Sequence, residues 1–158
     1  KQRDAPDVSA VALATLEKAG GKRFLVWVHF SDPDKNGHGF GENSAEYEQA
    51  IVTCDEWLGK FAQWLKDKGL YDKTRIYVVT DHGFDEAEKS HRYAPRSWLG
   101  TNDNAVIMGG HMHDIAATVL VRMGIDISRL QPAYPGRALI DAQPFIRQQA
   151  PAPAAAPR

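Results

Sequence analysis

The sequence has little of several features that mark large classes of protein. Cys54 is the only cysteine, which excludes an intrachain disulfide and a cluster of thiolate metal ligands. Lysine and arginine number 19 against 20 aspartate and glutamate residues, so the net charge is -1 and gives no electrostatic reason to expect nucleic acid or an acidic membrane surface as partner. The longest apolar run, FLVWV (24–28), is too short to span a bilayer. What remains is 158 residues of ordinary globular composition, enough for one domain with a core.

The two ends of the sequence differ from the rest. No signal peptide opens it, and it begins at Lys1 rather than Met, so we expect a processed or truncated start. The end, PAPAAAPR (151–158), is Pro/Ala-rich and cannot bury a core. We therefore predict one domain over residues 1–145 and a disordered tail over 146–158.

The spacing of apolar residues predicts both helices and strands. Helices with a three- and four-residue apolar spacing, each followed by glycine, are expected over residues 7–19, 44–68 and 114–124. Short apolar runs rich in β-forming residues predict buried strands at 23–30, 75–80 and 104–110. The glycine-rich segment between the first strand and the second helix is expected to be a loop. This order of elements predicts an α/β fold, a sheet with helices on both faces.

Two polar clusters directly follow predicted strands. Asp34 and His38 lie four residues apart in DKNGH, and Asp81 and His82 are adjacent in TDHGF. Because ligands of open α/β sheets bind beyond the carboxyl ends of the strands, both clusters are expected to face one crevice. Carboxylate oxygens and imidazole nitrogens suit zinc, although Asp, Asn and Gly are also the common residues of turns. Each cluster alone is therefore open to a purely structural interpretation.

Taken together, the motifs resemble the alkaline phosphatase superfamily, and within it the phosphodiesterase and nucleotide-pyrophosphatase branch. The resemblance rests on Asp-x-x-Gly-His at 34–38, Thr-Asp-His-Gly at 80–83 and the helix that begins DIAAT at 114–118. Ala117 stands where the family usually has proline, and Ala138 where it has serine. The resemblance covers roughly residues 7 to 142. It implies an alkaline-phosphatase-like fold of which this chain is the C-terminal half.

The resemblance also implies two divalent ions about 4 Å apart that clamp a phosphoryl group, most simply zinc, with manganese or calcium as alternatives. Asp34 and His38 would bind the first ion together with a third histidine, and Asp81 and His82 would bind the second. We choose His91 as the third ligand, because the family places this ligand between the Asp-His pair and the terminal helix.

Other side chains have weaker claims to a role in the site. His111 and His113 precede the last predicted helix, where a capping or surface role is expected. His29 lies inside a predicted strand and is expected to be a hydrogen-bonded core residue, or one that supports a metal ligand, rather than a ligand itself. Arg92 occupies the position where the family usually has glycine, and it and Arg96 could reach a phosphate, but arginine is common at surfaces.

The residues implied for catalysis are only partly within this sequence. The family's nucleophile is a serine or threonine on an early loop of an N-terminal half. Ser9 and Thr15 lie on a predicted helix instead, so we propose neither. The expectation is a parent enzyme that hydrolyses phosphate esters through a phospho-enzyme intermediate, with this chain supplying metal ligands and inactive by itself. Two-zinc members are often exported, which favours a periplasmic or extracellular location.

Three alternatives remain open. The sulfatase branch shares the terminal helix and an Asp-His-Gly-like segment, although it uses one calcium ion, and the DKNGH loop argues against it. Cofactor-independent phosphoglycerate mutases and phosphopentomutases share both motifs but use manganese. The third alternative is a non-catalytic metal-binding or interaction module built on the same fold.

Overall fold

The structure, a computed structural model, describes residues 3–94 and 96–140 and divides into two compact units. The first unit comprises Lys1–Arg75 and Val79–Trp98, and the second Ile76–Val78 and Leu99–Arg158. The α-helices are α1 (Ala5–Ala19), α2 (Asp32–Phe40), α3 (Ala45–Asp67) and α4 (Met112–Arg122). The remaining elements are two short 3-10 helices and two strands, η1 (Tyr71–Lys73), η2 (Ile127–Arg129), β1 (Tyr77–Val79) and β2 (Leu99–Thr101). The predicted tail over 146–158 lies outside the described residues.

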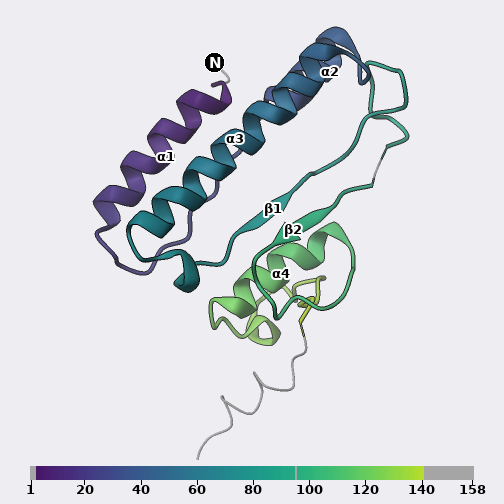
Figure 1. The fold of residues 1–158 in the computed structure, drawn as a ribbon. Coiled ribbons are helices and arrows are strands. Elements are labelled where there is room, and N and C mark those ends of the chain that lie inside the picture. Colours follow the sequence, from purple (N-terminus) through teal and green to yellow (C-terminus); the bar gives the residue numbers. More distant parts are fainter. Residues whose placement is uncertain (1–2, 95, 141–158) are drawn as a thin grey trace, which may run out of the picture. The chain divides into compact units, whose positions relative to one another are not determined.

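Helices α1 and α3 lie side by side in the first unit (Figure 1). The buried side chains of α1 recur at three- and four-residue spacing, as expected for a helix that packs along one face: Ala5, Ser9, Ala12 and Leu16. Gly20 ends α1 in the left-handed conformation, with φ of 60°. Near the same end of α1, the Trp64 indole N–H of α3 donates to the Glu17 carboxylate at 2.9 Å. Both helices were predicted from apolar spacing, and both are confirmed.

Residues 32–40 form helix α2, so the prediction of a glycine-rich loop is wrong. Ser31 precedes the helix and Pro33 lies in its first turn, where its fixed φ suits the helical backbone. Asp32 and Asp34 also lie in the first turn, where a negative charge is favoured by the helix dipole. The residues that suggested a turn are thus the ones that start a helix. The helix places side chains four residues apart on one face.

The strands β1 and β2 form a two-stranded sheet. Thr80 N–H donates to Trp98 O beyond one end of β1, and Ile76 N–H donates to the Asn102 side chain beyond the other, so the strands are antiparallel. β1 confirms the strand predicted at 75–80. The strand predicted at 104–110 is wrong, because its only β-bridge among the described residues joins Val106 to Ile140. A larger sheet with helices on both faces is not found in the described part of the chain.

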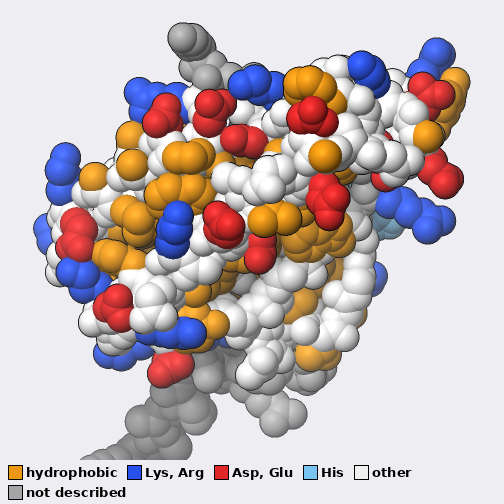
Figure 2. Space-filling view, turned by 45° about the horizontal axis from the view of Figure 1, so that its top comes forward, with side chains coloured by type: hydrophobic (Ala, Val, Ile, Leu, Met, Phe, Trp, Pro, Cys, Tyr) orange, Lys and Arg blue, Asp and Glu red, His pale blue; other side chains and the backbone are white. Residues whose placement is uncertain are grey.

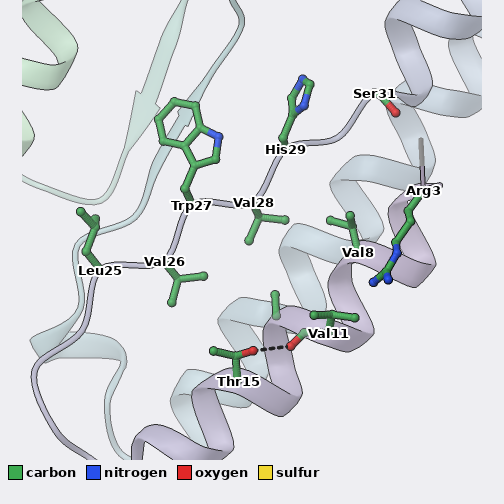
Figure 3. Close-up of a pocket in the computed structure, with 11 residues that line it drawn as sticks. Arg3, Val8, Val11, Thr15, Leu25, Val26, Trp27, Val28, His29 and Ser31 are labelled. Atoms are coloured by element: carbon green, nitrogen blue, oxygen red, sulfur yellow. Dashed lines mark hydrogen bonds between the residues drawn. The ribbon is translucent and has the colours of Figure 1, made fainter. Parts of the chain in front are cut away.

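Residues 23–30 are extended but belong to no β-ladder within the described residues. Their side chains alternate between half-buried and exposed, with Leu25 62% and Trp27 81% exposed. Val26 and Val28 point toward α1, whereas Leu25, Trp27 and His29 point away from it (Figure 3). The prediction of a buried strand is therefore wrong for this chain. A continuous apolar run needs cover on both faces, and the described residues cover one face only.

Helix α4 is joined to the segment that follows it by the buried side chains of Asp114 and Thr118. The Asp114 carboxylate accepts from the main-chain N–H groups of Arg137 and His111, each at 2.8 Å. Hydrogen bonds from these two N–H groups hold its pKa below the usual range. The Thr118 hydroxyl donates to Asp114 O and accepts from Leu139 N–H. The DIAAT motif thus has a structural role, and the predicted helix is confirmed with its start at Met112.

Asp103 anchors the second unit through a buried ion pair. Its side chain is 3% exposed and accepts from the Arg122 guanidinium at 2.7 and 3.0 Å and from the Tyr77 O–H at 2.6 Å. Burial raises the pKa of Asp103, but the hydrogen bonds from Arg122 and Tyr77 outweigh it, so the pKa lies below its usual range. These contacts connect α4 and β1 to the segment that follows β2.

We expect Asp103→Ala to lower the free energy of unfolding by about 3 kcal/mol, because it leaves a largely buried guanidinium without its partner. Urea unfolding at pH 7 measures the loss, and Asp126→Ala, which removes an exposed cap, is the control and should cost clearly less. The lowered pKa adds a pH dependence: the stabilisation is complete above about pH 4 and is lost as the pH falls through the folded-state pKa. The acid-dependent loss should be smaller in the Asp103→Ala variant, where Asp114, whose pKa is also lowered, still contributes to it. An undiminished loss in that variant would contradict the assignment.

Charged side chains of both signs are interspersed with hydrophobic ones on the face shown in Figure 2. Several large apolar side chains of the first unit are exposed, including Trp27 at 81% and Tyr93 at 77%. None of the helices in the described ranges combines the length and the apolar character needed to cross a membrane.

Candidate metal centre

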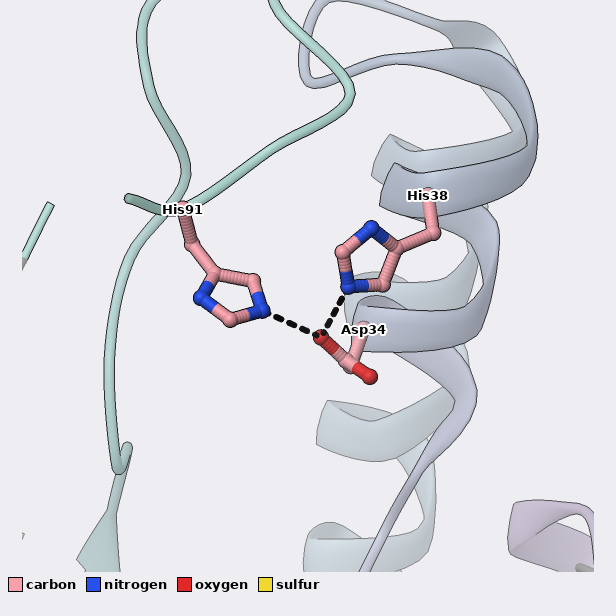
Figure 4. Close-up of side chains that lie close together, drawn as sticks. All are labelled: Asp34, His38 and His91. Carbon is pink, nitrogen blue, oxygen red and sulfur yellow. Dashed lines mark ion pairs between the residues drawn. The ribbon is translucent and has the colours of Figure 1, made fainter. Parts of the chain in front are cut away.

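Helix α2 and the loop that follows β1 bring three predicted ligands together. Asp34 and His38 come from one face of α2, and His91 comes from the loop (Figure 4). One ligand atom from each of the three lies within 4.8 Å of the others. His38 Nε2 is 3.4 Å and His91 Nε2 is 3.9 Å from Asp34 Oδ1. The predicted loop is in fact a helix, and Asp34 and His38 lie close together on it because a four-residue spacing suits one helix face. Their binding of one ion stays a prediction.

The Asp34 carboxylate has one oxygen that is buried and unsatisfied. The side chain as a whole is 44% exposed, yet Oδ1 is inaccessible and has no hydrogen-bond partner among the described residues. A buried carboxylate oxygen without a donor is costly, because it loses its hydration and gains nothing in exchange. A cation at this point would remove that cost.

Two imidazoles beside this oxygen are held by main-chain carbonyls. His38 Nδ1 lies 2.8 Å from Lys89 O, and His82 Nδ1 lies 2.9 Å from Gly83 O. A carbonyl can only accept, so each Nδ1 carries a proton, and in the neutral ring Nε2 then presents a lone pair. Histidines that bind metal are commonly oriented in this way. Lone pairs directed at a carboxylate oxygen repel it, and an intervening cation converts the same arrangement into attraction.

His82 joins the group, whereas Asp81 lies at its edge. His82 Nε2 is 3.7 Å from Asp34 Oδ1, and its ring stacks on that of His91 with centroids 3.8 Å apart. The Asp81 side chain is 77% exposed, with Oδ2 3.7 Å from His82 Nε2 and Oδ1 accepting from the His82 N–H. A second ion bound by Asp81 and His82 stays a prediction.

The rival histidines are not among the residues grouped around Asp34. His111 and His113 belong to the second unit, where their rings stack on each other with centroids 5.3 Å apart. His29 is exposed at the end of the extended segment, where it lines an open groove beside α1, so its predicted place in a core is wrong.

The loop that carries His91 is fixed by contacts that the sequence did not reveal. The Asp85 carboxylate accepts from the Ser90 O–H at 2.8 Å and from the Tyr93 N–H at 2.9 Å. The Lys89 ammonium donates to Gly39 O at 2.7 Å, near the end of α2. Lys89 orients a histidine through its main-chain carbonyl, so its side-chain type carried no signal in the sequence.

The donor set fits a zinc ion. In a tetrahedral site with bonds near 2 Å, neighbouring ligand atoms lie about 3.3 Å apart. The oxygen–nitrogen distances of 3.4 and 3.9 Å found here need only a small adjustment. One carboxylate and two imidazoles are also a ligand set that leaves a fourth position for water or substrate, as in catalytic sites.

Fold and site together define an α/β protein with a candidate catalytic metal centre. The sequence profile of the type I phosphodiesterase/nucleotide pyrophosphatase family matches residues 2–142, nearly the whole chain. The chain therefore belongs to this family and to the alkaline phosphatase superfamily.

Curated relatives share limited identity with the chain. It is 30% identical to a 2,3-bisphosphoglycerate-independent phosphoglycerate mutase of Wolbachia pipientis wMel, over 76% of this chain and 25% of the mutase. It is 32% identical to venom phosphodiesterase 2 of Crotalus adamanteus, over 45% of this chain and 9% of that protein. It is 26% identical to ectonucleotide pyrophosphatase/phosphodiesterase family member 1 of Mus musculus, over 52% of this chain and 9% of that protein. The chain thus spans a quarter or less of the length of these relatives. No solved structure matches it.

Proposed function

We propose that this chain is the metal-binding portion of an enzyme that hydrolyses phosphate esters, with phosphodiesters as the preferred substrates. The observation that carries the proposal is the buried, unsatisfied Asp34 oxygen surrounded by imidazole nitrogens. Asp34, His38 and His91 would hold one zinc ion, and Asp81 with His82 a second. Membership of the phosphodiesterase family supports this chemistry.

Bound zinc would supply a Lewis acid toward a phosphoryl oxygen. The chain's own residues prepare the site: Asp34 supplies negative charge, and the carbonyls of Lys89 and Gly83 keep the imidazoles in one tautomer. Ser9 is fully buried and the Thr15 hydroxyl donates to Val11 O within α1, which supports a nucleophile from outside this chain.

We propose further that an N-terminal half of the same enzyme completes the fold by pairing a strand with residues 23–30. This segment has the alternating burial of a strand, with Leu25 and Trp27 uncovered. Backbone N–H and C=O groups in an extended segment are matched by a second strand, and an alternating apolar strand would also cover Trp27. The curated relatives have ample additional chain to supply such a strand.

The test of the proposed hydrolysis uses the polypeptide encoded by the complete open reading frame, compared with residues 1–158 alone. We expect the complete polypeptide with zinc to hydrolyse bis(p-nitrophenyl) phosphate faster than p-nitrophenyl phosphate, and the 158-residue chain to be inactive. Zinc-dependent turnover by the 158-residue chain alone would contradict the proposal that the nucleophile lies outside this chain. If the complete polypeptide hydrolyses an aryl sulfate but neither phosphate ester, the sulfatase alternative is favoured instead.

A second candidate function is phosphoryl transfer in a mutase. It is favoured by the relative from Wolbachia, whose similarity extends over 76% of this chain. Interconversion of phosphoglycerates by the complete polypeptide, without release of inorganic phosphate, would favour the mutase over the hydrolase.

The venom and ectonucleotide enzymes among the relatives support an exported location, which we propose for the hydrolase.

A further inference from the structure

The ring of Phe84 lies among the histidines of the candidate centre. Its centroid is 5.2 Å from that of His38, 5.6 Å from His91 and 6.1 Å from His82. All three contacts are edge-to-face, with interplanar angles of 67–88°. Tyr47 of α3 makes a fourth such contact at 5.5 Å. One phenyl ring thus touches every imidazole that lies beside Asp34 Oδ1.

Helix α2 has a gap for this ring at Gly37. A Cβ atom at this position would lie 2.5 Å from Phe84 Cζ and within 2.9 Å of both Cε atoms. Carbon atoms cannot approach so closely without a shift, so any larger residue at 37 would displace the ring. Gly37 immediately precedes His38, and a displaced ring would change the surroundings of that imidazole first.

Phe84 is most important for His91. The rings of His38 and His82 are each fixed by a carbonyl that accepts from Nδ1. No such carbonyl contact is described for His91: apart from Nε2 beside Asp34 Oδ1, its ring stacks on His82 and meets His38 and Phe84 edge-on. An aromatic edge-to-face pair prefers one relative tilt, which restricts the direction in which Nε2 points.

We propose that Phe84 is a positioning residue, which sets the orientation of the three imidazoles so that each Nε2 faces the same point beside Asp34. The proposal rests on the proposed function only for the identity of the bound ion. The orientation of the rings in the metal-free chain is independent of it.

The test measures zinc affinity of the full 158-residue chain by competition with a chromophoric chelator. Phe84→Leu should weaken zinc binding about 10–100-fold, the range found when residues that orient metal ligands are replaced. Phe40→Leu is the matched control, because Phe40 lies on α2 with its side chain 56% exposed, and it should leave the affinity unchanged. Visible absorption of the Co²⁺-loaded chain should change in band position and intensity in Phe84→Leu alone. A residue that only supports folding would lower the melting temperature without these changes.

A second pair of variants tests the contact itself. Gly37→Ala should weaken zinc binding to an extent similar to Phe84→Leu, and the double variant should lose little more than either, because leucine leaves room for the new methyl group. Fully additive losses would contradict the contact.

Nitrogen NMR of the metal-free histidines gives a readout that needs no metal. We expect mixed tautomers or shifted ring signals in Phe84→Leu and wild-type signals in Phe40→Leu. Wild-type affinity and wild-type ring signals in Phe84→Leu would overturn the positioning role. A wild-type chain that binds no zinc would overturn the proposed metal site, whereas the ring signals would still decide the role of Phe84.

Discussion

Replacing Asp34 by asparagine in the complete polypeptide is expected to lower kcat/KM for phosphodiester hydrolysis by about a thousandfold. Asparagine keeps the shape of the side chain but removes the charge that balances the cation. A metal ion contributes several kcal/mol of charge stabilisation, and each 1.36 kcal/mol corresponds to about tenfold in rate. Asp34 Oδ1 is the atom toward which His38, His82 and His91 converge, whereas the Asp81 carboxylate lies beside His82 alone among the described contacts of these histidines.

The measurement is steady-state hydrolysis of bis(p-nitrophenyl) phosphate at saturating zinc. Asp67→Asn is the control, because this carboxylate ends α3 and accepts only an exposed hydrogen bond from Gln63 among its described contacts. A fall of less than tenfold in Asp34→Asn, with metal content unchanged, would remove Asp34 from the site.

Replacing His38 by alanine is expected to weaken zinc binding by the 158-residue chain more than a hundredfold. Replacement of residues that merely orient a ligand costs about 10–100-fold, and removal of a ligand itself should exceed that range. The loss follows from the geometry, because His38 Nε2 is the nitrogen closest to Asp34 Oδ1 and only one other imidazole completes the three-residue group.

His113→Ala is the matched control for this experiment. His113 is also a half-exposed histidine, with a side chain 50% exposed, but it belongs to the second unit and contacts His111 and Asp114. Metal analysis of the purified variants and chelator competition should show wild-type binding in His113→Ala. Equal zinc content in His38→Ala and the wild type would refute the site, and loss in His113→Ala alone would assign it to the second unit.

The sequence predicted those parts of the fold that depend on local patterns. The helices α1, α3 and α4 have regular apolar spacing and a glycine after their last turn, and all three formed as predicted. Helix α2 was missed because its starting residues are also turn residues. Tertiary packing favours the helix over a turn, because Gly37 allows the Phe84 ring to lie against α2. This long-range contact cannot be read from the nine residues of α2 alone.

The candidate site was proposed from the resemblance to the alkaline phosphatase superfamily, which rests on residue types and their order along the chain. The choice of His91 over His111 and His113 rested on its position relative to the Asp-His pair, and the structure places it beside Asp34. Phe84 and Lys89 could not be predicted, because one acts through ring packing and the other through a backbone carbonyl. The segment 23–30 shows the opposite limit: its apolar, β-forming composition predicted a buried strand, but among the described residues it belongs to no β-ladder.

The extended segment 23–30 also leads to an expectation for the purified chain, because no strand covers it among the described residues. Extended, apolar edges are templates on which further molecules add, and natural proteins block them with lysine, proline or a bulge. Residues 24–30 contain no lysine and no proline, and Trp27 is 81% exposed. Self-association of the purified chain should therefore rise with concentration and fall when Trp27 is replaced by lysine. Zinc affinities should therefore be measured at protein concentrations at which light scattering shows a monomer. In an aggregate, binding sites can be blocked, and new ones can form between chains.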